Sequence, residues 1–228
     1  MSFALVVMYE APDGTAVPEV EIAALRVLLA GVPALDEALI FTPASARDVY
    51  TDDGSSPPLG LQLLFARLED LEAAAGPLRG LEGVLPSLAG TQVNAQAFWR
   101  RRYPVDAPWP RPAAGALPCS YVVHYPGPAS DPDAWHAHYI AGHPPLFRRL
   151  PGIRGIEILT PVDWVNALPF KRARHMQRNR VLFDSPQALT EALHSPVRHE
   201  LREDFKGFPP FENGNKHYPM WTETLRRN

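Results

Sequence analysis

The sequence predicts an α+β protein made of two tandem units, each with the element order strand, helix, strand, strand, helix, strand. Three observations support this fold class: the same order of expected elements in both halves, short residue matches at a nearly constant spacing, and five prolines between residues 102 and 118. We therefore divide the 228 residues into an N-terminal unit, 1–104, a proline-rich linker, 105–118, and a C-terminal unit, 119–228.

The first half carries four segments that predict strands and two that predict helices. Apolar, β-branched and aromatic residues predict strands at 3–9, 37–42, 61–67 and 91–99. An apolar stripe at helical spacing predicts a helix over 18–30, and a short helix is expected at 68–75. Residues 44–58 are polar and rich in turn-forming residues, which indicates a loop.

The second half repeats this order. Strands are expected at 120–125, 155–160, 178–183 and 218–224. After the first of them, a helix begins at Asp131, which can cap it, and ends at Leu150-Pro151-Gly152. Helices are expected at 185–194 and 196–205, and a loop at 162–175.

The two halves also match in residues. Val-Val-Met-Tyr at 6–9 matches Val-Val-His-Tyr at 122–125, which lies 116 positions later. Ile-Phe-Thr-Pro at 40–43 matches Ile-Leu-Thr-Pro at 158–161, and Leu-Phe at 64–65 matches Leu-Phe at 182–183, both 118 positions later. This nearly constant spacing indicates an internal duplication.

A βαββαβ unit folds as a ferredoxin-like layer, with one antiparallel sheet and both helices on one face of it. The other face of the sheet is apolar and has to be covered. Two such units in one chain can cover each other sheet to sheet, so we expect them to close a barrel with the helices outside. A ligand site can then lie within the barrel or between a sheet and its helices.

Composition and charge limit the classes of function. A net charge of −3 and a pI near 6.2 argue against a nucleic-acid or membrane-surface partner. No signal peptide precedes the first strand, and no run approaches the ~18 apolar residues of a membrane span. The single cysteine, Cys119, excludes an internal disulfide and suits a reducing compartment. We expect a cytoplasmic protein whose partner is a small molecule.

Residues 131–152 concentrate histidines and aromatic residues. His136, His138 and His143 fall within eight residues, beside Trp135 and Tyr139. On a helix, Tyr139 lies one turn from both Trp135 and His143. Aromatic rings beside an imidazole form a surface that can hold a flat apolar molecule and move a proton on it. The alternative is that these histidines only pack or face solvent.

The segment His138-Tyr139 … His143-Pro-Pro-Leu146 … Leu150-Pro-Gly152, preceded by the strand Tyr121-Val-Val-His-Tyr125, resembles the EthD-type branch of the dimeric α/β-barrel superfamily. The resemblance covers residues 119–225, whereas the first half is similar only in its strand and turn pattern. It implies an intrachain version of a fold more often made by two chains, and hence a monomer or a homodimer. It also implies a small, cofactor-free enzyme among cyclases, dehydratases, decarboxylases, isomerases and quinone-forming monooxygenases, without selecting one reaction.

Comparison of the two halves places the expected site in the C-terminal unit. Met8 stands where the second half has His124, and Leu25 stands where it has His143. Histidines that served only packing would have no reason to be kept in one copy and replaced by aliphatic residues in the other. The pattern therefore favours a single retained site.

Within that site we expect His143 to act as the general acid or base, because imidazole titrates near ~6.5. Tyr139 is expected to bind a substrate oxygen or orient the imidazole. His138 is a second candidate base, and His124 is a third unless it only packs at a strand edge. The expected substrate-binding residues are aromatic. They lie near this segment, in the loop 162–175, which could act as a lid, or on the last strand, whose inward face the pattern does not reveal. They are Trp135, Tyr121, Phe147, Trp164, Phe170, Tyr218 and Trp221.

Other chemistries lack their motifs. The sequence has no Gly-x-Gly-x-x-Gly, no phosphate-binding loop and no Cys-x-x-Cys. His138 and His143 are five residues apart, a poor spacing for one metal ion, so we expect no metal and no cofactor. The leading hypothesis is a cofactor-independent lyase, cyclase or isomerase, in which a histidine moves a proton on a small aromatic or polyketide-like compound. The alternatives are a haem protein with His143 as the axial ligand, and a non-catalytic carrier or accessory factor to an oxygenase.

Overall fold

The computed structural model describes residues 2–109 and 117–226, so the predicted linker 105–118 lies partly outside the described residues. The elements of the first half are β1 (Ser2–Glu10), α1 (Glu19–Ala30), β2 (Glu37–Pro43), β3 (Leu59–Phe65), α2 (Leu68–Ala73), α3 (Ala75–Leu78), α4 (Leu81–Val84), a 3-10 turn (Pro86–Leu88) and β4 (Gln92–Tyr103). Those of the second half are β5 (Cys119–Tyr125), α5 (Pro132–Arg148), β6 (Gly155–Pro161), β7 (Lys171–Arg172), β8 (Gln177–Phe183), α6 (Pro186–Leu193), α7 (Pro196–Lys206) and β9 (Lys216–Arg226).

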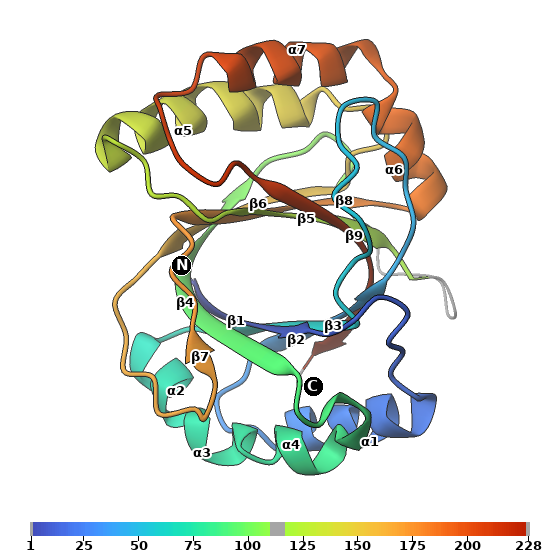
Figure 1. The fold of residues 1–228 in the computed structure, drawn as a ribbon, viewed down its shortest axis with the longest axis vertical. Helices are drawn as coiled ribbons and strands as arrows, with labels where there is room; N and C mark the ends of the chain where they lie inside the picture. The colour runs from blue at the N-terminus through green and yellow to red at the C-terminus, as the bar shows by residue number, and fades with distance from the viewer. Residues whose placement is uncertain (1, 110–116, 227–228) are drawn as a thin grey trace.

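The strands close into a barrel (Figure 1). Their order is β1-β3-β2-β9-β5-β8-β6-β4, and β4 pairs back with β1. All of these pairings are antiparallel, and only the short β7 adds to the outside of β4 in parallel. The two halves are joined where β2 pairs with β9 and where β4 pairs with β6.

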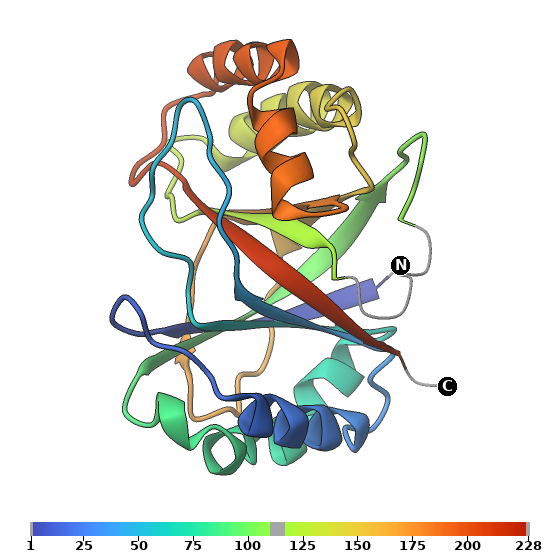
Figure 2. The same cartoon turned by 90° about the vertical axis from the view of Figure 1, so that its right-hand side faces the viewer.

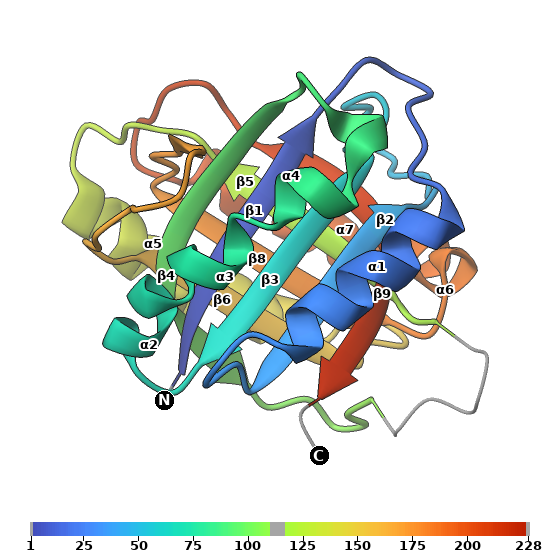
Figure 3. The same cartoon turned by 90° about the horizontal axis from the view of Figure 1, so that it is seen from below.

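Helices cover the barrel from outside. Helices α5, α6 and α7 lie over the sheet of the second half, and α1 to α4 lie over the sheet of the first half, as the views in Figures 2 and 3 also show. The predicted α+β barrel is thereby confirmed. The strand order is β4-β1-β3-β2 in the first half and β9-β5-β8-β6 in the second, which is the same relative order. That the two halves arose by duplication of one unit stays a prediction. Within the described part of the chain, no helix has the length and apolar character needed to cross a membrane.

Local signals in the sequence explain the bounds of α5. The Asp131 side chain accepts a hydrogen bond of 2.9 Å from the backbone nitrogen of Ala134, and Pro132 occupies the first turn, where its missing N–H is not needed. After the helix ends, Gly152 adopts a φ of +73°, which a residue with a side chain rarely adopts. The chain then enters β6, so both ends of the histidine-rich helix are held by these short-range features.

Alternate residues of β5 face different layers. Tyr121, Val123 and Tyr125 belong to the core between the second sheet and its helices. Val122 packs instead with residues of β2 and β9 inside the barrel. His124, an even-numbered neighbour of Val122, lies on the same interior face because side chains alternate along a strand.

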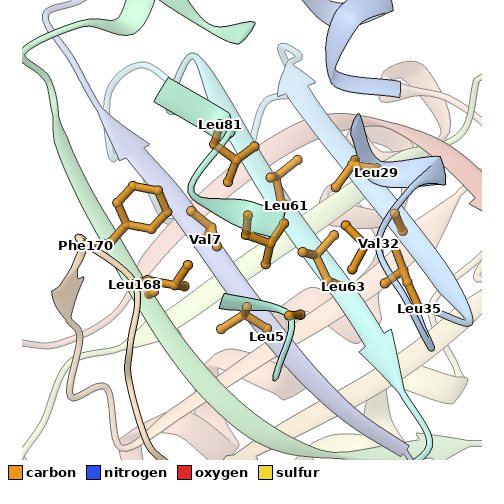
Figure 4. Packing of buried hydrophobic residues seen from close by; sticks show 14 of the residues in the cluster. Leu5, Val7, Leu29, Val32, Leu35, Leu61, Leu63, Leu81, Leu168 and Phe170 are labelled. Atoms are coloured by element: carbon orange, nitrogen blue, oxygen red, sulfur yellow. The ribbon is translucent and has the colours of Figure 1, made fainter. Parts of the chain in front are cut away.

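A separate core fills the space between the first sheet and its helices (Figure 4). Leu168 and Phe170, from the loop between β6 and β8, extend into this core beside Val7. Trp164 of the same loop is buried there as well. The prediction that the loop 162–175 forms a lid over a site in the second half is therefore wrong: its apolar side chains cover the first half, where a layer of short helices leaves room for them.

Candidate active site

A histidine–aspartate pair lies between the two long helices that cover the second sheet. His143 of α5 is only 5% exposed, and its Nδ1 is hydrogen-bonded to the carboxylate of Asp204 on α7. Since a carboxylate only accepts hydrogen bonds, Nδ1 carries the proton and Nε2 is the basic atom of the ring. Nε2 has no hydrogen-bond partner in the described part of the chain. The pair therefore offers one free basic nitrogen.

Burial is the largest influence on the His143 imidazole. It lowers the pKa of His143, while the hydrogen bond and the negative charge of Asp204 raise it, and burial prevails. The imidazole is therefore neutral near pH 7 and ready to accept a proton. Asp204 is placed to stabilise the imidazolium that forms, in the way that a carboxylate supports a catalytic histidine.

Gly142 allows Asp204 to reach this position. A Cβ atom added at Gly142 would lie 2.9 Å from Asp204 Oδ2 and nearer still to Oδ1. Real Cβ atoms do not approach other atoms so closely, so a side chain at 142 would displace the carboxylate. His138, one turn earlier on α5, has its Nε2 3.6 Å from Asp204 Oδ1 and its side chain 35% exposed. Asp204 thus lies between two histidines and is hydrogen-bonded to His143.

Aromatic rings pack around His143 and fix its orientation. The ring centroids of Tyr139, Phe208 and Phe147 lie 4.9, 4.8 and 5.2 Å from that of the imidazole. The Tyr139 hydroxyl accepts a hydrogen bond from Asn179 of β8. Burial raises the pKa of Tyr139 well above its usual range, so its phenol stays protonated. Tyr139 therefore positions the imidazole and does not compete with it as a base.

His143 lines a cavity of about 50 Å³ between the second sheet and its helices. The sheet contributes Tyr125 and Asn179, and α7 contributes Arg198 and Phe205. Most of the remaining wall is aliphatic or aromatic. The cavity thus combines the free nitrogen of His143, a second histidine, His217, and an otherwise largely apolar lining, which is the usual composition of a small-molecule site.

The loop between β2 and β3, residues 44–58 of the first half, borders this cavity. Figure 2 shows the loop, drawn in blue to cyan, running past β9 to α6 and α7. Asp48 accepts hydrogen bonds of 2.9 Å from Arg198 and 3.0 Å from the Tyr121 hydroxyl. Asp53 contacts His217 Nδ1 at 2.7 Å, and Thr51 is part of the cavity wall. The first half therefore completes the site of the second.

The predicted catalytic residues do not form one cluster. His143, Tyr139 and His138 lie together on α5, but His124 faces the barrel interior on the other side of the sheet. The prediction that His124 shares a site with His143 is wrong, because the strand alternation turns its side chain away from the helices. Tyr218 also lies in the interior, with its ring centroid 5.0 Å from that of His124.

The predicted substrate-binding residues divide in the same way. Tyr121 and Phe147 line the cavity. Trp135 is fully buried behind Tyr139, on which it stacks with centroids 5.2 Å apart, and does not line the cavity. Trp164 and Phe170 belong to the core of the first half, and Tyr218 and Trp221 lie on opposite faces of β9, neither of them in the cavity wall. Counting Trp135, five of the seven predicted substrate-binding residues lie outside the cavity wall, which corrects the sequence-based prediction.

Sequence reasoning missed Asp204, Gly142 and the loop 44–58. Asp204 lies three residues after Leu201 and next to Phe205, so the apolar stripe of the helix places it near the face that packs against α5. That spacing is the one local signal that points to it. Nothing local in residues 44–58 indicates a contact with the second half. In the described residues, no group of three or more histidine, cysteine, aspartate or glutamate side chains is arranged to hold a metal ion.

Comparisons with known proteins identify the fold. No model of a protein family matches the chain, and no curated protein matches it. Among solved structures, an anthrone oxidase-like protein has a TM-score of 0.63 at 13% identity, over 99% of this chain and 92% of that one. A protein named "Putative monooxygenase" from Fusobacterium nucleatum has a TM-score of 0.62 at 8% identity, over 100% and 95% of the two chains. Another of that name, from Lactobacillus acidophilus, has a TM-score of 0.55 at 8% identity, over 99% and 96%.

These likenesses agree with the predicted α+β barrel, whereas membership of the dimeric α/β-barrel superfamily stays a prediction. The EthD branch stays a prediction. At identities this low the likeness concerns the fold, and the reaction has to be argued from the site itself.

Proposed function

We propose that this protein is an enzyme in which His143 removes a proton from a small aromatic substrate bound between the second sheet and its helices. The observation that carries the proposal is the His143–Asp204 pair beside an apolar cavity. Nδ1 is held by the carboxylate, and Nε2 is the nitrogen left for substrate. This arrangement of base and orienting carboxylate is the general form of an activated histidine.

The surroundings favour an acidic C–H or a phenolic O–H as the proton donor. Apolar walls exclude water and strengthen the interaction between Asp204 and the imidazolium formed in the reaction. Negative charge that develops on a substrate oxygen needs hydrogen-bond donors, and Tyr125 and Asn179 bring polar groups to the sheet side of the cavity. Such a proton transfer leaves a substrate anion and an imidazolium, and it is the first step expected of a cyclase, isomerase or lyase.

The closed cavity is too small for such a substrate. Its volume of about 50 Å³ compares with the roughly 150 Å³ of a protein cavity that binds benzene. Substrate entry therefore requires the cavity to open, and the loop 44–58 is the wall that is held by side-chain contacts and not by strand pairing. We propose that this loop, supplied by the first half, moves to admit substrate.

Deuterium exchange tests the proposed proton transfer without knowledge of the final product. Anthrone and other hydroxyaromatic ketones are incubated with the protein in deuterated buffer, and deuterium at the acidic carbon is followed by mass spectrometry. The wild-type protein should accelerate exchange, His143→Gln should abolish the acceleration, and the exposed His194→Gln is a matched control that should retain it. Exchange at the uncatalysed rate across the panel would contradict the proposal.

A second candidate function follows from the same proton transfer. The names of the fold neighbours, an anthrone oxidase-like protein and two putative monooxygenases, favour oxidation of the substrate anion by O₂. For an anthrone, the carbon that loses the proton would become a carbonyl, with one O₂ consumed and one water released. An oxygen electrode separates the candidates, because a lyase or isomerase consumes no O₂.

In the alternative of a haem protein, His143 would be the axial ligand. His143 has the free Nε2 that an axial ligand needs, but three aromatic rings pack within about 5 Å of the imidazole. A porphyrin on this nitrogen would require the aromatic rings packed on the imidazole to move as well, and not the loop 44–58 alone. The residues of the closed site therefore do not fit a haem, and a Soret band in the purified protein would contradict the assignment. The non-catalytic carrier is distinguished by ligand binding without exchange.

A further inference from the structure

The barrel interior holds a second polar cluster, on the opposite face of β5 and β8 from the candidate active site. Glu157 of β6 accepts hydrogen bonds from Arg100 at 2.9 Å, from Arg180 at 3.1 Å and from Gln62 at 2.9 Å. The two guanidinium groups hold the pKa of Glu157 well below its usual range. The Glu157 carboxylate therefore pairs with two of the cations in the barrel interior, Arg100 and Arg180.

Arg178 is a third interior cation, and it has no such partner. Its residue is 1% exposed, and its Nε and Nη1 atoms form no hydrogen bond with any described residue. The remaining nitrogen, Nη2, donates to His175 Nδ1 at 3.3 Å. His124 Nε2 is likewise buried and unpartnered in the described chain. Three polar atoms from two neighbouring strands are thus left without partners in one part of the barrel.

The groups around Arg178 do not supply a compensating charge. The His124 ring lies 5.1 Å from that of His175 and 5.0 Å from that of Tyr218, measured between centroids. Burial lowers the pKa of both histidines, and burial raises that of the Tyr218 hydroxyl, so these groups are neutral near pH 7. Burial lowers the pKa of Arg178 to about 9, and Tyr218 and Glu10 offset this only in part; the Glu10 carboxylate is itself bound by Gln92 and Asn94 at the end of β1. Lys216, which pairs with His124 across β5 and β9, adds no negative charge.

A buried guanidinium without a counter-charge is strongly unfavourable, whereas one that binds an anion gains charge-assisted hydrogen bonds. We propose that the barrel interior binds a small monovalent carboxylate, held by Nε and Nη1 of Arg178 with His124 and Tyr218 as neighbouring donors. A single negative charge matches the single unpaired guanidinium. The site is separated by the sheet from the cavity at His143, so it stands independently of the proposed function.

Thermal unfolding at fixed ionic strength tests this site. Sodium formate and sodium acetate are titrated in place of sodium chloride, and the melting temperature is recorded. An anion that binds only the folded protein should raise the melting temperature by a saturable amount. Arg178→Met should abolish the formate-dependent rise, and Arg149→Met, at an exposed ion pair with Glu200, should leave it unchanged. Titration calorimetry with formate should show the same pattern.

If Arg178→Met does not fold, His124→Gln and Tyr218→Phe replace it. Loss of one hydrogen bond at either position should weaken formate binding about tenfold. A melting temperature that is independent of the anion would overturn the proposal and indicate that water solvates the guanidinium. A rise with chloride but not with formate would overturn the assignment to a carboxylate. A formate effect that persists unchanged in the Arg178 variant would place the anion elsewhere and also refute it.

Discussion

Gly142→Ala tests whether the close approach of α5 and α7 creates the reactive histidine. The new methyl group would lie 2.9 Å from Asp204 Oδ2, where ordinary contact begins at 3.4 Å, so the carboxylate must withdraw by at least 0.5 Å. Loss of its hydrogen bond to His143 destabilises the fold by about 1.5–3 kcal/mol. Alanine in a helix interior stabilises the fold by about 0.5–1 kcal/mol relative to glycine, because it loses less backbone entropy on folding. We therefore expect a net loss of about 0.5–2.5 kcal/mol.

The effect on exchange should be much larger than the effect on stability. Without the carboxylate, the imidazole loses its tautomer and orientation, which should lower the exchange rate by roughly 10²–10⁴. Stability is measured by denaturant unfolding and exchange by mass spectrometry. Gly83→Ala is the matched control, because a Cβ at Gly83 meets no atom within 4 Å. Wild-type exchange and stability in Gly142→Ala would refute the reasoning.

Three further predictions concern the same pair, the interior histidine and the loop. Asp204→Asn should lower exchange by roughly 10²–10⁴ with little loss of stability, since the amide can donate to Nδ1 and move the ring proton to Nε2; nitrogen NMR reports the tautomer, and full activity would contradict its role. The free energy of unfolding should fall as the pH drops from ~6.5 towards 4. Burial lowers the pKa of His143 and His124, so in this range the unfolded chain binds protons at these two histidines and the folded protein does not. Each histidine contributes about 1.4 kcal/mol per pH unit to the slope of the unfolding free energy against pH. His124→Gln should therefore make this slope shallower, and an unchanged slope would contradict the prediction. Asp48→Ala should destabilise the fold by about 3–5 kcal/mol by leaving Arg198 buried and unpaired; a loss below 1 kcal/mol on denaturant unfolding would show that the loop 44–58 is not held there.

Much of the fold could be predicted from the sequence because its signals are local. Alternating apolar residues indicate the strands, and a turn or capping residue marks their limits, as at the Asp131 cap and Pro161. The paired matches Ile-Phe-Thr-Pro and Ile-Leu-Thr-Pro then relate the halves. The barrel follows because each sheet has one apolar face that needs a cover.

The candidate site was only partly predictable, since its contacts are long-range. The helical spacing of Tyr139 and His143 puts them side by side, and the structure shows this contact. Asp204 is separated from His143 by 61 residues and reaches it because α7 packs against α5, a long-range contact that the local sequence does not determine. His124 was misplaced because the register decides which face of β5 meets the helices, and the apolar pattern of that strand is the same on both faces.

The central claim, that His143 is a general base, is tested most directly by the pH dependence of exchange. In the wild type, the rate should rise as the imidazole loses its proton and level off by neutral pH, with a midpoint below the ordinary histidine pKa because burial favours the neutral ring. His143→Gln should lose this limb together with roughly 10²–10⁴ in rate. The same limb at the same midpoint in His143→Gln would contradict the account and assign the titration to another group.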